Sequence, residues 1–134
     1  MARMIFVNLP VKDLDRAKDF FTKLGYEFNP QFTDDNAGCL VLGENIYAML
    51  LTEPFFQGFS QRDLPDNMKT TGTIVALSAE SRQEVDEYVD RALANGATEG
   101  RSGVDEGSMY GRSFHDPDGH LWEYMWMDPS AVEG

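Results

Sequence analysis

Residues 109–127 read MYGRSFHDPDGHLWEYMWM, a pattern that predicts two strands joined by a tight turn. The turn is Asp116-Pro117-Asp118-Gly119, because Pro117 presets φ at the second position and Gly119 is favoured at the fourth. In the second strand, both sets of alternating side chains are mainly apolar, so we expect both faces to be covered. Glu123 is the only charged residue in LWEYMWM, and burial of a carboxylate is costly without a partner. Glu123 is therefore the first candidate for a functional residue.

The composition indicates one globular domain over residues 1–134, with 42% hydrophobic and 12% aromatic residues. The formal net charge of -12, without a cluster of Lys and Arg, argues against nucleic-acid binding and against attraction to anionic membranes. Cys39 is the single cysteine, so one chain cannot build a disulfide framework or a cysteine-based zinc site. The sequence has no signal-peptide pattern and no apolar run long enough for a membrane span, which predicts a cytoplasmic protein.

The first half of the chain predicts the order β-α-β-β-β. Ile5–Leu9 reads as a buried strand, Asp13 as the N-cap of an amphipathic helix, and Gly25 as the end of that helix. The three following strands are expected at 26–32, 38–42 and 46–51, as an antiparallel meander.

Residues 53–72 interrupt this pattern with two prolines and two glycines. A connection of this length in a compact domain is usually functional or mobile. Three phenylalanines in the first part of the segment indicate that it packs on something: Phe55, Phe56 and Phe59. We expect a lid over a pocket or a contact with a second subunit.

The second half repeats the order of the first. Thr73–Leu77 predicts a strand, Ser81 with Glu84 a capping box, and Gly96 the end of a helix. Residues 97–101 can form a strand and residues 102–108 a loop before the hairpin. The predicted organisation is module one over 1–52, a connecting segment over 53–72, module two over 73–127 and a tail over 128–134.

Two β-α-β-β-β modules, with Val11-Lys12-Asp13-Leu14 after the first strand and D-P-D-G-x-x-x-E at the end, resemble the vicinal-oxygen-chelate superfamily. This superfamily includes glyoxalase I, extradiol dioxygenases, fosfomycin-resistance enzymes and bleomycin-binding proteins, and the chain looks most like bacterial predicted lactoylglutathione lyases. The resemblance implies an α+β fold, in which the tandem modules form an open barrel-like curved sheet with helices outside. It also implies a ligand cavity enclosed by that sheet.

The metal enzymes that the chain resembles hold a divalent ion with inward-facing His or Glu side chains. By that resemblance, the four ligand positions fall on Phe6, Leu50, Ile74 and Glu123. Three apolar side chains cannot donate to a cation, so we expect no metal and no cofactor. The alternative is a divalent metal ion held by ligands at other positions, such as Glu44 or Glu53.

Glu123 has two interpretations. In an apolar cavity its carboxylate is a candidate catalytic base or acid. It is equally able to pair with a buried donor such as Asn8, Ser78 or Arg112, and this structural interpretation is favoured. Arg112 in turn could bind a ligand carboxylate or phosphate, or pair with an acidic side chain of the protein.

His115 and His120 flank the turn and, with Asp116 and Asp118, make a possible metal set. We expect these residues at the surface, with the aspartates bonded to the backbone, and so predict no metal there.

The predicted function is binding of a small molecule by a protein of this superfamily with a degenerate metal site. The alternative is a metal-dependent lactoylglutathione lyase-like enzyme or dioxygenase that uses Glu123, and a second alternative is a structural or partner-binding domain with a filled cavity. A homodimer is expected. The predicted ligand-binding residues are Phe6, Asn8, Leu50, Ile74, Tyr110, Arg112 and Glu123.

Overall fold

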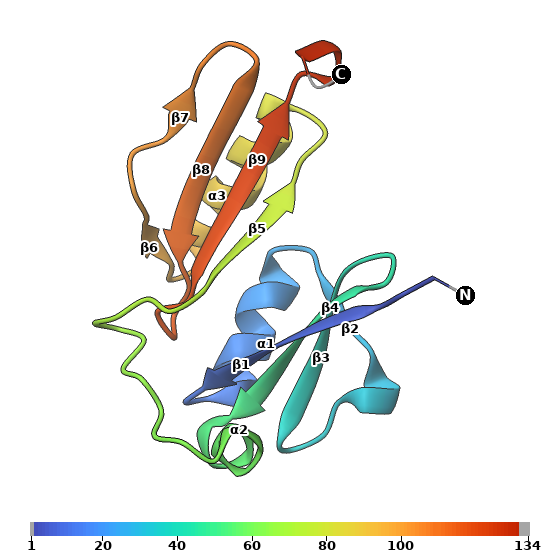
Figure 1. The fold of residues 1–134 in the computed structure, drawn as a ribbon, viewed down its shortest axis with the longest axis vertical. Helices are drawn as coiled ribbons and strands as arrows, with labels where there is room; N and C mark the ends of the chain where they lie inside the picture. Colours follow the sequence, from blue (N-terminus) through green and yellow to red (C-terminus); the bar gives the residue numbers. More distant parts are fainter. Residues whose placement is uncertain (1, 132–134) are drawn as a thin grey trace. The chain divides into compact units, whose positions relative to one another are not determined.

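The structure is a computed structural model that describes residues 2–131. The chain divides into two compact units, Met1–Pro65 and Asp66–Gly134 (Figure 1). The boundary lies inside the predicted connecting segment, so each unit contains one of the two expected modules. That the modules together form one domain stays a prediction. Among the described residues, no helix combines the length and the apolar character that crossing a membrane requires.

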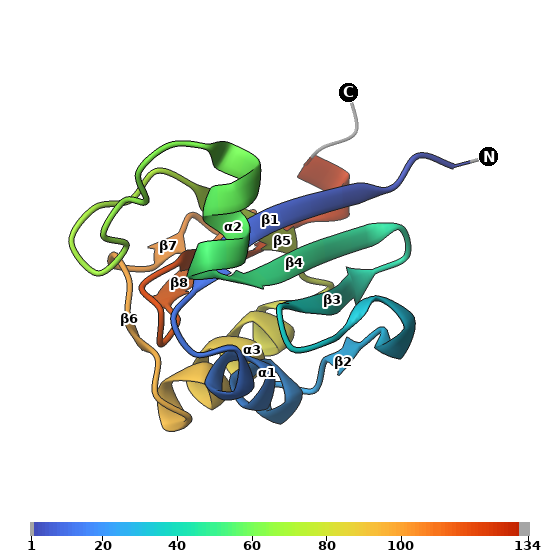
Figure 2. The same ribbon diagram turned by 90° about the horizontal axis from the view of Figure 1, so that it is seen from below.

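The first unit contains a four-stranded sheet in the order β1-β4-β3-β2, counted over its described residues. Strands β1 and β4 run parallel, whereas β4, β3 and β2 are antiparallel neighbours. Figure 2 shows α1 along one side of this sheet, and α2 contacts β1 and β4. The elements are β1 (Ile5–Val11), α1 (Leu14–Lys23), β2 (Glu27–Phe28), the 3-10 helix η1 (Pro30–Phe32), β3 (Ala37–Gly43), β4 (Ile46–Thr52) and α2 (Glu53–Ser60).

Helix α1 confirms the predicted start and end signals. The side chain of Asp13 accepts a hydrogen bond from the backbone N–H of Arg16 at 3.1 Å, which caps the first turn. Gly25 follows the helix with φ +104°, a conformation that glycine adopts without strain. The apolar stripe is buried, as its spacing predicts, through Leu14, Ala17, Phe20 and Phe21.

Two predictions for the first unit are wrong in detail. The strand expected over 26–32 is only two residues long, because Asn29 accepts from the backbone N–H of Gln31 and Pro30 opens a 3-10 turn. The connecting segment begins with the unpredicted helix α2, in which Phe55 and Phe59 pack edge to face at 5.1 Å. Phe55 and Phe59 remain 38% and 71% exposed, so within the described structure these side chains bury little apolar surface.

The second unit contains a five-stranded sheet in the order β5-β9-β8-β6, with β7 also pairing with β8, within residues 66–131. Strands β5 and β9 run parallel, and β8 is antiparallel to β9, β6 and β7. Residues 132–134 of the predicted tail lie outside the described residues. The elements are β5 (Ile74–Ser78), α3 (Arg82–Ala94), β6 (Thr98–Glu99), β7 (Val104–Asp105), β8 (Met109–His115), β9 (Leu121–Met127) and the 3-10 helix η2 (Pro129–Ala131).

The predicted hairpin is confirmed. The backbone N–H of Gly119 donates to the carbonyl of Asp116 at 2.9 Å, which closes the turn between β8 and β9. One face of β9 packs on α3, where the rings of Tyr88 and Tyr124 stack with centroids 4.8 Å apart. The opposite face carries Leu121, Glu123 and Met125, which are only half-buried. We call this the open face of the second sheet. The prediction that both faces of β9 are covered is confirmed for the face that packs on α3, whereas the open face is only partly covered.

Candidate functional site

The open face of the second sheet places Glu123 beside Ser113 of β8 and Ala76 of β5. Residues paired directly across neighbouring strands point to the same face, and Glu123 is paired with both. The side chain of Glu123 is 20% exposed, and its carboxylate lies 3.5 Å from Nη2 of Arg101. Arg101 is itself 64% exposed, so solvent weakens this ion pair. The partner of Glu123 is thus a loop arginine that no sequence motif singled out.

Ser113 adds an unusual polar atom to this face. Its side chain is 3% exposed, and among residues 2–131 its Oγ has no hydrogen-bond partner. Gly100 lies directly over that oxygen, and a Cβ at residue 100 would overlap it. An unpaired buried hydroxyl costs free energy, so the Ser113 hydroxyl destabilises the fold as long as Gly100 covers it.

Arg112 and Tyr110 lie on the other face of β8, towards α3. Nη1 of Arg112 lies 3.0 Å from Asp86 and 2.8 Å from Asp90, both on α3. The hydroxyl of Tyr110 donates to Asp86 at 2.6 Å, and this bond, with those from Arg112, holds the pKa of the Asp86 carboxyl below its ordinary value. The structure therefore separates Arg112 and Tyr110 from Glu123. The prediction that Arg112 and Tyr110 join Glu123 in one ligand site is corrected. Of the two alternatives for Arg112, the structure shows the ion pair with acidic side chains of the protein.

The predicted residues of the first unit divide between two faces. Phe6 and Asn8 share a face, as their parity predicts, and Phe6 stacks on Tyr47 at 4.9 Å. Leu50 is paired with Leu9 on the opposite face and is fully buried. Leu50 thus belongs to the core, and its prediction as a ligand-binding residue is corrected.

Ile74 lies on the open face of the second sheet, and that it contacts a ligand stays a prediction. It is paired with Leu121, shares a face with Glu123 two residues along, and is 57% exposed. An exposed isoleucine beside a half-buried carboxylate forms a surface that suits an apolar molecule with one polar group.

The turn between β8 and β9 is buried, which corrects the prediction that its residues lie at the surface. Oδ1 of Asp116 accepts from the backbone N–H groups of Asp118 and His120, at 2.9 and 3.0 Å, and Oδ2 accepts from Trp122. The predicted use of this aspartate for backbone bonding is confirmed. Burial raises the pKa of the Asp116 carboxyl, while the neighbouring His120 acts in the opposite direction.

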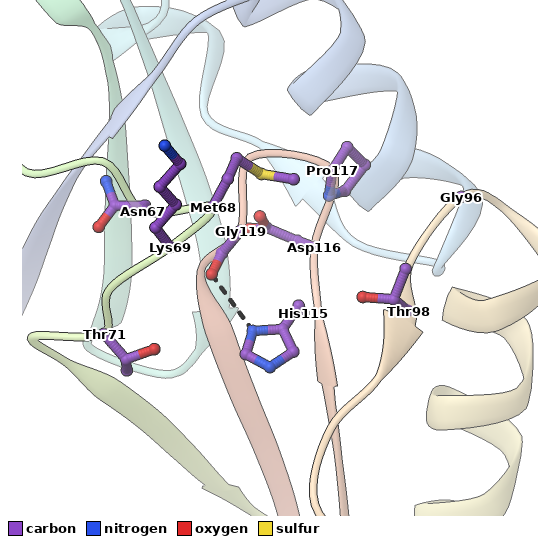
Figure 3. Close-up of a pocket in the computed structure, with 10 residues that line it drawn as sticks. All are labelled: Asn67, Met68, Lys69, Thr71, Gly96, Thr98, His115, Asp116, Pro117 and Gly119. Atoms are coloured by element: carbon purple, nitrogen blue, oxygen red, sulfur yellow. Dashed lines mark hydrogen bonds between the residues drawn. The ribbon is translucent and has the colours of Figure 1, made fainter.

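A pocket of about 350 Å³ lies beside this turn, entirely within the second unit (Figure 3). Its walls come from residues 67–71 before β5, from the start of β6 and from the turn itself. His115, the last residue of β8, stands in the wall with Nδ1 3.3 Å from the carbonyl oxygen of Gly119. Sequence reasoning missed this pocket, because nothing in the chain signals that residues 67–71 pack against the hairpin.

Comparisons with known proteins agree with this architecture. A family described as bleomycin resistance protein-like N-terminal matches residues 3–43, which run from β1 to the end of β3. A hypothetical protein from S. aureus is 26% identical, with a TM-score of 0.78 over 94% of this chain and 95% of that one. A glyoxalase/bleomycin resistance protein/dioxygenase family enzyme from Burkholderia phytofirmans PsJN is 15% identical, with a TM-score of 0.77 over 94% and 99%. The chain has the glyoxalase/bleomycin-resistance fold.

The same fold occurs in the bleomycin resistance determinant encoded on the transposon Tn5, with 18% identity and a TM-score of 0.67 over 95% of this chain and 99% of that one. No curated protein matches the sequence. The α+β fold class predicted from the two modules is therefore confirmed, and the family match together with the fold supports the superfamily.

The metal ion found in enzymes of this fold does not fit the residues present here. Phe6, Leu50 and Ile74 occupy the positions that the resemblance assigns to ligands, and their side chains have no donor atoms. Within residues 2–131, no three His, Cys, Asp or Glu side chains lie close enough together to hold an ion.

Proposed function

We propose that this chain is a small-molecule-binding protein of the glyoxalase/bleomycin-resistance/dioxygenase superfamily, with a degenerate metal site. The observation that supports it is the half-buried carboxylate of Glu123 on the open face of the second sheet, paired only weakly with Arg101. The apolar side chains around it, Ile74 and Leu121, offer contact area, while Glu123 offers one charged acceptor. The ligand is then a small apolar or flat molecule that carries a hydrogen-bond donor or a positive charge.

The buried hydroxyl of Ser113 fits the same proposal. It faces the same side of the sheet as Glu123 and has unused hydrogen-bonding capacity. Gly100 covers this oxygen, so a ligand donor that reaches Glu123 bonds to Ser113 only when Gly100 moves away. We also propose, as part of this function, that the protein works in the cytoplasm as a homodimer.

The test is thermal unfolding with a panel of small aromatic amines and alcohols. We expect at least one compound to stabilise the wild-type protein, by about 2.7 kcal/mol at a hundred times its Kd, and to stabilise Glu123→Gln clearly less. Glu106→Gln, at an exposed loop position, is the matched control and should behave as the wild type. The proposal fails if no compound stabilises the wild type, or if Glu123→Gln responds as fully as the control.

The alternative is a metal-dependent lactoylglutathione lyase-like enzyme or dioxygenase that uses Glu123. The position of Glu123 supports this alternative, because it matches the one metal-ligand position at which the chain keeps the residue of the metal enzymes. Metal analysis of the purified protein, with melting curves with and without chelator, decides between the two. Stoichiometric metal and a melting temperature that falls with chelator would favour the enzyme.

A further inference from the structure

Between β6 and β7 the chain leaves its regular pairing with β8 (Figure 1). The pairing ends at Glu99 and resumes at Val104, so the four residues 100–103 lie opposite only residues 112 and 113 of β8. Such a bulge interrupts the ladder and changes the direction in which its side chains point. We call residues 100–103 the strap.

The bulge directs Arg101 to the open face of the second sheet. A regular ladder would place residue 101 opposite Arg112, whose side chain lies towards α3. Instead, the guanidinium of Arg101 lies 3.5 Å from the carboxylate of Glu123, on the other face. Among residues 2–131, this ion pair is the only polar contact of residues 101–103. It is thus the polar contact that holds the middle of the strap over the open face.

The strap covers a hydroxyl that needs a partner. The backbone N–H of Gly100 donates to the carbonyl oxygen of Ser113 at 3.0 Å, and a Cβ at residue 100 would overlap the Oγ of Ser113. This Oγ is buried and has no hydrogen-bond partner among the described residues. The closed strap therefore keeps an unpaired hydroxyl in place, and displacement of the strap returns this oxygen to water or to a ligand.

The ion pair between Arg101 and Glu123 is weak enough to be replaced. Its 3.5 Å is longer than a charge-assisted hydrogen bond of about 2.8 Å, and the side chain of Arg101 is 64% exposed. Exposed ion pairs shift an equilibrium by about fivefold at most. The side chain of Glu123 is only 20% exposed, so a cation that binds it closely and excludes water is attracted more strongly than Arg101 is.

The approach to Glu123 is open on the side of β5, away from the strap. Ala76 of β5 is paired with Glu123, and its small side chain is exposed. Ile74 and Leu121 are paired with each other and lie on the same face, two residues along their strands. An apolar body can therefore lie over Ile74 and Ala76 while its charged group reaches Glu123.

We propose, resting on the function proposed above, that the Glu123 site selects an organic cation with an amidinium, guanidinium or ammonium group, and that Arg101 occupies the place of this group in the free protein. The guanidinium of Arg101 already lies against the carboxylate. A ligand amidinium can bond both carboxylate oxygens at shorter distance, because no strap restrains it. The ligand replaces Arg101, the strap moves away, and the Ser113 hydroxyl becomes available.

The experiment is a titration of the 15N-labelled full chain with benzamidine and with benzamide, followed by NMR. The two probes have nearly the same shape, but only benzamidine is charged. We expect saturable binding of benzamidine, about tenfold or more tighter than that of benzamide, with shifts of the backbone amides of residues 100–103, 113 and 123.

The outcomes separate this selection from the proposed function. Benzamide that binds as tightly as benzamidine overturns the selection of a cation, while binding of small molecules on the open face stands. Absence of saturable binding of both probes also overturns the selection, whereas the proposed function is decided by the wider panel of compounds. Benzamidine binding that leaves the amides of the strap unshifted overturns the displacement of Arg101.

Two matched variants test the role of Arg101. Arg101→Gln removes the internal competitor and should bind benzamidine about two- to fivefold more tightly than the wild type. Arg62→Gln removes the same charge at an exposed position of the first unit and should leave the affinity unchanged. Equal affinities in the two variants overturn the proposal. Glu123→Gln should lose the preference for benzamidine over benzamide.

Discussion

The indole Nε1 of Trp122 donates a hydrogen bond to Oδ2 of Asp116 at 2.9 Å, and both side chains are buried. Trp122 belongs to the core between the second sheet and α3, whereas Asp116 opens the turn that ends β8. The bond therefore ties the shape of the turn to the packing of the core. The remaining oxygen of Asp116 holds the turn itself, through the N–H groups of Asp118 and His120.

Replacement of Asp116 by Asn should destabilise the protein strongly. The Asn side chain has only one acceptor oxygen, so its NH2 group would face N–H donors in a buried position. We expect the free energy of unfolding to fall by about 3 kcal/mol, as measured by urea denaturation followed by tryptophan fluorescence. Asp128→Asn is the control, because Asp128 also accepts a backbone N–H bond but is only half-buried. A loss in Asp116→Asn no larger than in the control would contradict this prediction.

Gly119→Ala tests the contact that builds the pocket wall. The matched control is Gly107→Ala, since Gly107 has φ +80°, close to the +89° of Gly119, but nothing within 4 Å of its Cβ position. Both variants incur the backbone strain, and only Gly119→Ala meets the backbone of Asn67. We expect Gly119→Ala to lose about 2 kcal/mol more than the control in urea denaturation. Equal losses would mean that the approach of Asn67 is not tight in solution.

Ser113→Ala should be neutral or stabilising, in contrast to most buried substitutions. The removed hydroxyl has no partner among the described residues, so its loss relieves a desolvation cost of up to about 1 kcal/mol. The control is Ser81→Ala, which removes a hydroxyl that caps α3 at 3.0 Å and should cost about 1 kcal/mol. Differential scanning calorimetry of the two variants checks the sign. A destabilised Ser113→Ala would show that the hydroxyl has a bond in solution.

The stability of the second unit should depend on pH through Asp86. Bonds from Tyr110 and Arg112 hold the pKa of Asp86 below its unfolded value of about 3.9. The stabilisation is therefore present above that value and is lost as the pH falls through the lower, folded pKa. We expect the free energy of unfolding to decrease below about pH 4, and the decrease to be smaller in Asp86→Asn.

Urea denaturation at several acidic pH values measures this slope. Tyr110→Phe removes the largest of the interactions that lower the pKa of Asp86, the bond of 2.6 Å, and should also flatten the slope. Slopes that match the wild type in both variants would show that other carboxylates govern the acid response.

The sequence by itself determined the fold class and the order of the elements apart from α2 and β7, because the signals for them are local. The N-cap at Asp13, the left-handed glycine at residue 25 and the D-P-D-G turn each act within a few residues, and alternation within LWEYMWM defines a strand with two faces. These signals repeated in the two halves, which was sufficient to predict the paired modules. Where local signals competed, as at Asn29 and Pro30, the strand was predicted too long.

Only the tertiary structure decided which side chains meet. Alternation separates the residues of a strand into two sets, but strand pairing and the position of α3 determine which set lies against the helix. For this reason Arg112 lies with Asp86 and Asp90, while Arg101, from a loop, reaches Glu123. The pocket beside the β8–β9 turn joins three segments that are distant in the chain, and their contact depends on backbone packing at Gly119, which no local pattern encodes.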